Sequence, residues 1–151
     1  EAVTRPTMRF VPIKSAERQG VLVLHRTRDL LMRQRTMLLN AVRGHLPEFG
    51  LIAPQGPRKV MELVAQMREG ARADLPEIAR TALLGIGLQL DALARQIHAL
   101  ERQLLTWHRQ DAASQRLETI PGVGIITATA LAASSGRTSA SASDAASTAS
   151  R

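Results

Sequence analysis

Between residues 83 and 107, large apolar residues recur at intervals that alternate strictly between three and four. Eight residues form this 83–107 seam: Leu83, Ile86, Leu90, Leu93, Ile97, Leu100, Leu104 and Trp107. Such an alternation is the heptad repeat of a helix that packs lengthwise on another helix. No polar residue interrupts the seam, so neither register nor the number of helices is specified. The pattern predicts a coiled-coil helix over residues 75–111, paired with another helix of the chain or with a second copy.

A second long helix is predicted over residues 15–46, with Ser15 as its N-cap. Its apolar stripe consists of Val23, Leu24, Leu30, Leu31, Met37, Leu38 and Ala41, with Thr27 and Gln34 in line. The stripe repeats every seven residues, which favours antiparallel pairing with the 83–107 seam. Arginines border the stripe or lie behind it: Arg18, Arg26, Arg28, Arg33, Arg35 and Arg43. They form either a solvated face or a row of phosphate contacts.

The positive charge of the chain is concentrated in its N-terminal third. The net charge is +7, and residues 1–46 hold nine Lys or Arg against three Asp or Glu. A GC-rich genome would favour Arg, which outnumbers Lys eighteen to two, but it does not explain the clustering. The clustering favours an anionic partner. With only two Phe, one Trp and no Tyr, the chain has almost no platform for stacking on single-stranded bases.

Residues 112–133 contain the sequence LETIPGVGIITATALAA, which is typical of a helix-hairpin-helix element. We expect Gly122 and Gly124 to allow a tight turn, because glycine takes positive φ without steric cost. A helix starting at about Ile125 would present free N–H groups to a phosphate oxygen. Gly122, Val123 and Gly124 are therefore candidate contacts to a nucleic-acid backbone. The alternative is an ordinary hairpin that packs two helices.

The remaining segments have weaker signals. We expect a short strand at Met8 to Val11. Residues 47–74 are expected to contain a loop, followed by a short helix from Lys59 to Glu69. Asp74 fits an N-cap with Glu77 at the third helical position. Residues 134–151 are mostly Ser, Ala and Thr, and we expect them to be disordered. The predicted fold is mainly α: long helices in a helical hairpin or coiled coil, then the helix-hairpin-helix element and the tail.

The sequence contains no recognisable catalytic or metal-binding motif. It has no Cys, and its acidic residues are scattered; we expect most to pair with nearby bases, as Asp91 would with Arg95. His98 and His108 are expected to be ordinary helix residues outside the seam. No apolar run approaches the length of a membrane span, and no secretory leader is visible, so a cytoplasmic location is expected.

Two long stretches resemble one family of bacterial insertion-sequence transposases. The first is RFVPIKSAERQGVLVLHRTRDLLMRQRTMLLNAVRGHLPEFGL, and the second is LPEIARTALLGIGLQLDALARQIHALERQLLTWHRQDAASQRLETIPGVGIITATALAAS. The family pairs an N-terminal RuvC-like (DEDD) domain with a C-terminal serine-bearing transposase domain and is grouped with the bridge-RNA-guided recombinases. The resemblance covers about residues 1–134. It implies DNA transposition, with a basic helix at 15–46, an assembly coiled coil at 75–111 and the start of the transposase domain at 112–133.

The family's catalytic residues cannot be carried over to this chain. The resemblance implies four acidic residues that hold a divalent metal, and only the flank of that domain remains, at residues 1–14. It also implies a serine nucleophile beyond the hairpin, where residues 134–151 do not resemble the family and have the character of a frameshifted tail. We expect a truncated fragment without a catalytic site, cofactor or strand-transfer activity of its own.

Two functions therefore compete at this point. The first is nucleic-acid binding and oligomerisation in DNA transposition, with DNA, guide RNA and a second copy as the implied partners. The second is a purely structural oligomerisation module, in which the arginines serve solubility alone. Salt-dependent nucleic-acid binding distinguishes them.

Overall fold

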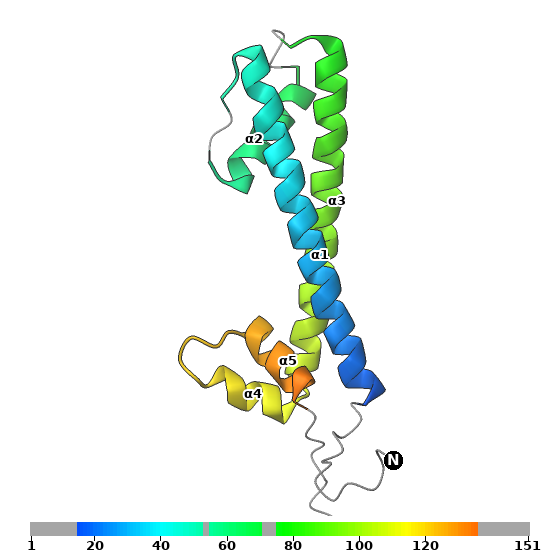
Figure 1. The fold of residues 1–151 in the computed structure, drawn as a ribbon, viewed down its shortest axis with the longest axis vertical. Coiled ribbons are helices and arrows are strands. Elements are labelled where there is room, and N and C mark those ends of the chain that lie inside the picture. The colour runs from blue at the N-terminus through cyan, green and yellow to red at the C-terminus, as the bar shows by residue number, and fades with distance from the viewer. Residues whose placement is uncertain (1–14, 53–54, 71–74, 136–151) are drawn as a thin grey trace, which may run out of the picture.

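Two long antiparallel helices, α1 (Ala16–His45) and α3 (Glu77–His108), form the axis of the molecule (Figure 1). The computed structural model describes residues 15–52, 55–70 and 75–135, and these contain helices but no strand. Shorter elements pack at the two ends of the pair. The 3₁₀-helix η2 (Leu46–Phe49) and α2 (Pro57–Arg68) lie at one end, and α4 (Ala112–Glu118) and α5 (Ile125–Ser134) at the other.

The predicted start of α1 is confirmed. The Ser15 side chain accepts a hydrogen bond from the backbone N–H of Arg18 at 3.3 Å, as an N-cap does. The helix ends at His45, and the chain continues into η2, where Pro47 occupies an early position. Residues 46–49 thereby turn the chain towards α2.

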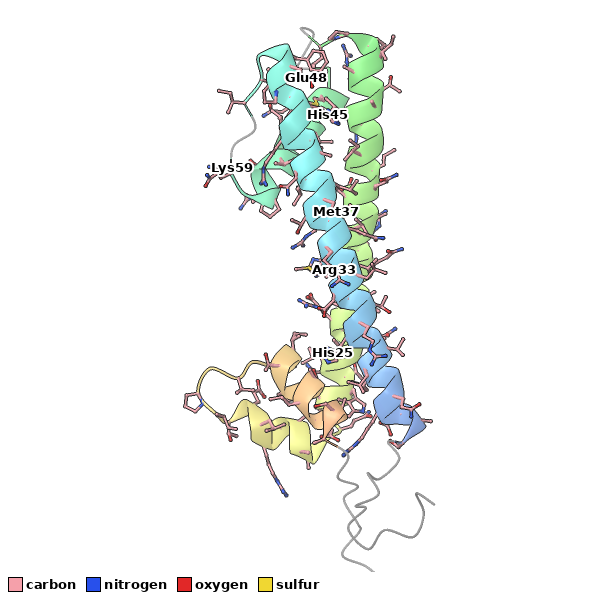
Figure 2. The ribbon with its side chains drawn as sticks, in the orientation of Figure 1. His25, Arg33, Met37, His45, Glu48 and Lys59 are labelled. Atoms are coloured by element: carbon pink, nitrogen blue, oxygen red, sulfur yellow. The ribbon has the colours of Figure 1, made fainter. Side chains whose placement is uncertain are left out.

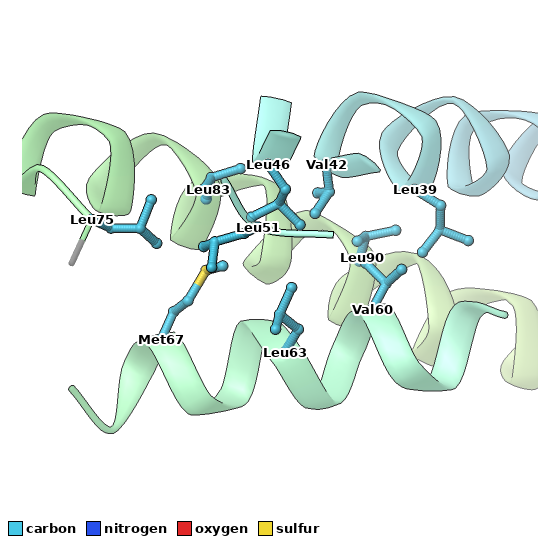
Figure 3. Packing of buried hydrophobic residues seen from close by; sticks show 10 residues of the cluster. All are labelled: Leu39, Val42, Leu46, Leu51, Val60, Leu63, Met67, Leu75, Leu83 and Leu90. Carbon is cyan, nitrogen blue, oxygen red and sulfur yellow. The ribbon is translucent and has the colours of Figure 1, made fainter. Parts of the chain in front are cut away.

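At the upper end in Figure 1, α2 closes a core between α1 and α3. The helix begins at Pro57, two residues before the expected Lys59, because proline suits the first turn of a helix. Figure 3 shows the buried members of this upper core: Leu39, Val42, Leu46, Leu51, Val60, Leu63, Met67, Leu75, Leu83 and Leu90. Burial of these side chains is the main force that holds α2 on the long pair.

The start of α3 differs from the prediction. Glu77 is the first helical residue and not the third, and Pro76 stands at the N-cap without a side-chain hydrogen bond. A proline in an extended conformation supplies the turn into the helix here. The proposed cap Asp74 lies outside the described residues.

At the lower end, α5 packs against both long helices in a smaller core. The buried residues of this lower core are Val21 of α1, Leu104 and Trp107 of α3, and Ala132 and Ala133 of α5. The small side chains of α5 allow its backbone to approach α1 and α3 closely. Residues 112–133 thus contain two helices joined by a turn, α4 and α5, and α5 anchors them to the long pair.

The apolar stripe predicted for α1 is only half used in packing. Val23, Leu30 and Met37 are 55, 47 and 69% exposed, and the other four apolar members of the stripe are partly buried. The fully buried residues of α1 are Val21, Leu39 and Val42, and none of them was in the predicted stripe. The α3 helix thus lies to one side of the stripe. The apolar sector of α1 is wider than one neighbouring helix covers, and the sequence pattern does not specify which edge is covered.

Some predictions concern residues outside the described part. The strand at 8–11, the flank at 1–14 and residues 136–151 of the predicted tail belong there. The tail boundary at 134 is wrong by two residues. Ser134 is the last residue of α5, and the Ser135 N–H donates to the Leu131 carbonyl at 2.9 Å.

Candidate nucleic-acid interface

Two of the six candidate arginines on α1 bond to residues that are distant in the chain. Arg28 Nε and Nη2 both donate to Glu101 Oε1 of α3, at 2.9 and 2.8 Å. Arg18 Nη1 donates to the Ser135 carbonyl at 2.7 Å, and its Nη2 lies 3.9 Å from Asp111 Oδ2. Both side chains are more than four-fifths buried. They connect α1 to distant parts of the chain and are poorly placed to bind a phosphate.

The other four candidates divide into two groups. Arg26 and Arg33 are exposed on α1 and take part in no ion pair with any described residue, and Figure 2 labels Arg33 midway along the helix. Arg35 and Arg43 are partly buried, and the Nε atom of each is buried without a hydrogen-bond partner in the described structure. Arg43 Nη1 also donates to Asn40 Oδ1 at 3.3 Å. Arg26 and Arg33 are thus the most accessible cations among the six.

The turn between α4 and α5 is built around one glycine with positive φ. Gly122 has φ +86°, as expected, whereas Gly124 has φ −84° and occupies the N-cap of α5. The expectation of positive φ at Gly124 is wrong, because the turn needs only one such residue. Helix α5 starts at Ile125 as predicted, and its first bond is Ala128 N–H to Gly124 O at 2.9 Å. The N–H groups of its first turn remain available, as at any helix start.

The structure does not bring the hairpin turn next to the α1 arginines. Figure 1 shows the turn between α4 and α5 projecting away from the long pair, whereas the end of α5 lies against α1. Any nucleic acid that contacts both Arg33 and Gly122 must therefore extend across the lower end of the molecule.

A buried polar cluster that the sequence did not reveal fixes the corner between α3 and α4. His108 is 5% exposed; its Nδ1 lies 2.7 Å from Ser114 Oγ and its Nε2 lies 2.9 Å from Glu118 Oε2. The expectation of an ordinary helix position for His108 is wrong. The sequence contained a signal for the burial of His108. It follows the seam residue Leu104 by four positions, so both side chains lie on the same face of the helix. Ser114 is fully buried, so its hydroxyl is closed to a substrate, whereas the Glu118 side chain is 43% exposed.

A second histidine links α1 to α5. His25 Nε2 lies 3.1 Å from Thr129 Oγ1, and the Thr129 hydroxyl also lies 2.9 Å from the Ile125 and Ile126 carbonyls. Burial lowers the pKa of His25 below its ordinary value of 6.5, and nearby Arg28 lowers it further while Asp29 opposes the shift. The fold therefore favours neutral His25.

We expect the free energy of unfolding to fall as the pH drops below about 6.5. The unfolded chain takes up the His25 proton first, because the pKa in the folded chain is lower. The stabilisation from neutral His25 is fully present above pH 6.5 and is lost as the pH falls towards the folded pKa. Urea unfolding followed by Trp107 fluorescence between pH 5 and pH 8 measures this loss. His25→Gln is the control, and equal pH dependence in both proteins would contradict the assignment.

The 83–107 seam lies largely in the interior of a single chain. Six of its eight residues are buried there: Leu83, Leu90, Leu93, Ile97, Leu104 and Trp107. Ile86 and Leu100 are partly buried. Packing of α3 on α1, α2 and α5 thus occupies the seam, and oligomerisation through these residues remains a prediction.

Charge pairing on α3 also differs in detail from the sequence pattern. Asp91 pairs with Arg68 of α2, with Nη2 and Oδ2 3.4 Å apart, and not with Arg95 on its own helix. Within the described ranges, no group of three or more His, Asp or Glu is arranged to hold a metal ion. No helix in those ranges is both long and apolar enough to cross a membrane.

The sequence of this chain is similar to those of proteins named as transposases. The chain is 45% identical over 137 residues to a probable family 20 transposase of Pseudomonas aeruginosa, covering 90% of this chain and 40% of that protein. It is 44% identical over 131 residues to a protein named as a transposase in Sinorhizobium fredii, covering 87% of this chain and 33% of that protein. The transposase for insertion sequence element IS1328 of Yersinia enterocolitica is 36% identical over 132 residues, which are 87% of this chain and 39% of that protein.

The chain spans between a third and two-fifths of the length of these relatives. Neither a family model nor a solved structure matches it. Along most of its own length, the chain is similar to one segment of proteins named as insertion-sequence transposases.

Proposed function

We propose that this chain takes part in DNA transposition by binding the nucleic-acid backbone and by assembling with other copies. The similarity of nearly nine-tenths of the chain to transposases carries the proposal. A role on DNA also implies a cytoplasmic location in a bacterium. The family resemblance adds guide RNA as a second candidate ligand, and it would place a RuvC-like domain before residue 15 in full-length proteins.

The contacts to the nucleic-acid backbone are assigned first to Arg26 and Arg33. Both residues are exposed, and their separation of seven positions corresponds to about 10 Å along the helix. Arginine forms bidentate hydrogen bonds with phosphate oxygens, which suits this role. Arg35 and Arg43 supply further positive charge nearby, and the turn at 122–124 is a second, separate contact. Arg18 and Arg28 are assigned a structural role because of their bonds to Ser135 and Glu101.

No catalytic step is assigned to the described residues. The divalent metal of the full-length family has no fitting set of ligands among them. Binding and assembly are the contributions that we propose for these residues.

The test is fluorescence anisotropy of labelled duplex DNA, and separately of structured RNA, titrated with the chain at several salt concentrations. We expect the affinity to fall steeply with salt, by a slope of about −0.9 in log K per duplex phosphate neutralised. The double variant Arg26→Gln/Arg33→Gln should weaken binding and reduce that slope by about 1 to 2, because two phosphate contacts are removed.

The matched control is Arg58→Gln/Arg68→Gln, which removes the same charge from α2. Both arginines are largely exposed and pair with Glu62 and Asp91, so little stability is lost. The control should retain the salt slope. Equal losses in the two double variants would contradict a localised interface, and no binding at low salt would leave the structural module as the function.

A further inference from the structure

The exposed side of α3 carries a repeated Arg-Gln pair. The pair occurs three times at intervals of seven residues, and all six residues are exposed: Arg95–Gln96, Arg102–Gln103 and Arg109–Gln110. Seven residues correspond to about 10 Å of helix, so the three arginines form a row about 21 Å long, from the middle of α3 to its C-cap. We call these three arginines the α3 row.

The α3 row keeps its positive charge although residues 75–111 hold four basic and four acidic residues. The four carboxylates all pair with arginines outside the row: Glu77 with Arg80, Asp91 with Arg68, Glu101 with Arg28 and Asp111 with Arg18. Three of these partners come from α1 or α2, so the fold moves the negative charge of α3 into contacts between helices. The α3 row has no ion pair in the part of the chain that the structure describes.

The α3 row lies well around the helix from the interior. Each of its arginines follows a buried residue by five positions, which is a rotation of about 140° in an α-helix. The three buried residues are Leu90, Ile97 and Leu104. The arginines therefore point away from the core and towards one side of the α1–α3 pair.

The exposed arginines of α1 point towards that same side. Arg26 follows buried Val21 by five positions, and Arg33 follows Arg28, which bonds to Glu101 of α3, by the same interval. Because the two helices are antiparallel (Figure 1), equal rotations away from the sides on which they face each other lead to one side of the pair. Arg26 and Arg33 thus share this side with the α3 row.

The register of the two helices also places these arginines at matching heights. The bond between Arg28 and Glu101 fixes the register. Arg26 lies about 3 Å from Arg28 along the axis, and Arg102 lies about 1.5 Å from Glu101 in the same direction. The same count in the other direction matches the remaining two, so the array has two levels: Arg26 with Arg102, and Arg33 with Arg95.

The chemistry of this array fits the phosphate backbone of a double helix. Guanidinium groups form bidentate hydrogen bonds with phosphate, and the neighbouring glutamine amides are further donors to phosphate oxygens. Among the described residues from 89 to 119, no large apolar side chain is exposed. Trp107 is 9% exposed, and its Nε1 donates to Glu17 Oε1 at 2.8 Å. The α3 side therefore lacks both an apolar anchor for a protein partner and a platform for stacked single-stranded bases.

We propose that Arg95 and Arg102 bind the same nucleic-acid double helix as Arg26 and Arg33, and that Arg109 extends the contact towards α4. This inference deepens the proposed function and rests on it. It makes the α1–α3 pair, and not α1 alone, the unit that binds the backbone. Double helices of DNA and of RNA present the same phosphate chemistry to the array.

The experiment is fluorescence anisotropy of a labelled DNA duplex, and separately of an RNA duplex, titrated with the full chain at several salt concentrations. Arg95→Gln/Arg102→Gln should reduce the slope of log K against log salt by about 1 to 2, because two phosphate contacts are removed. Adding Arg26→Gln/Arg33→Gln should reduce the slope by about as much again, because both pairs contact one duplex. The duplex that the unmodified chain binds more tightly identifies the nucleic acid that the array takes.

Two controls separate phosphate contact from a general loss of charge or fold. Arg58→Gln/Lys59→Gln removes two exposed charges from α2 and leaves Arg68 paired with Asp91, so it should retain the slope. Lysines at positions 95 and 102, in Arg95→Lys/Arg102→Lys, keep the charge and should also retain it. Circular dichroism shows whether the helices are intact. If the double glutamine variant unfolds, Arg95→Gln and Arg102→Gln are tested singly, each with an expected reduction of about 0.9.

The outcomes distinguish this inference from the proposed function. If Arg95→Gln/Arg102→Gln leaves the slope unchanged while Arg26→Gln/Arg33→Gln reduces it, the α3 row is not part of the interface and only this inference is overturned. If the unmodified chain binds no duplex at low salt, the proposed function itself is overturned. A single strand that binds as tightly as the duplex and loses as much in the variants would overturn the assignment to a double helix.

Discussion

Replacing Leu104 by Ala should lower the free energy of unfolding by about 2–5 kcal/mol. Leu104 is fully buried in the lower core, where Val21, Trp107, Ala132 and Ala133 are the other buried members. Truncation removes apolar contacts and leaves a cavity between three helices that cannot close completely. Urea unfolding measured by circular dichroism and by Trp107 fluorescence gives the change, and the single tryptophan reports on this core directly.

Leu88→Ala is the matched control on the same helix. Leu88 is 61% exposed, so its truncation should change the free energy of unfolding by no more than about 0.5 kcal/mol. The folded Leu104→Ala variant should keep the oligomeric state of the unmodified chain, because Leu104 packs within one chain. A small stability loss together with weakened association between copies would show that the 83–107 seam joins two copies, contrary to the structure.

The elements that the sequence predicted well are those specified by local patterns. The heptad spacing of the 83–107 seam predicted a helix near the observed Glu77–His108, and Ser15 marked the start of α1. The turn between α4 and α5 was predicted because glycine accepts positive φ without steric cost, and Gly122 has this conformation. Each of these signals depends on residues within one or two turns of each other.

Some of the features that were missed depend on residues far apart in the chain. Arg28 is one of six similar arginines in the sequence, and only the antiparallel register of α1 on α3 places it beside Glu101, 73 residues away. The same register decides that Val21 is buried and Val23 is not. Periodicity showed that α1 has a broad apolar sector, but it could not show which edge α3 covers. The exposed edge is therefore visible only in the fold.

Gly87 of α3 should tolerate alanine much less well than Gly85, although both glycines lie within the same turn of the helix. At Gly85 an added Cβ meets nothing within 4 Å, so Gly85→Ala should stabilise the chain by about 1 kcal/mol through helix propensity. At Gly87 an added Cβ would overlap Val64 Cγ1 of α2. Overpacking of this kind costs about 1–3 kcal/mol, so Gly87→Ala should be less stable than Gly85→Ala by that amount. Urea unfolding of the two variants measures the difference.

The neighbour at Gly87 has little room to move. Val64 is 1% exposed, and its branched Cβ restricts rotation about χ1. Combining Gly87→Ala with Val64→Ala removes the overlapping methyl, so the double variant should be more stable than the sum of the two single changes predicts. Additive changes would mean that α2 moves away from α3 without resistance. A favourable coupling would establish that the close approach of α2 requires glycine at position 87. Judged by helix propensity alone, this glycine only weakens α3, whereas the packing of α2 explains why it is there.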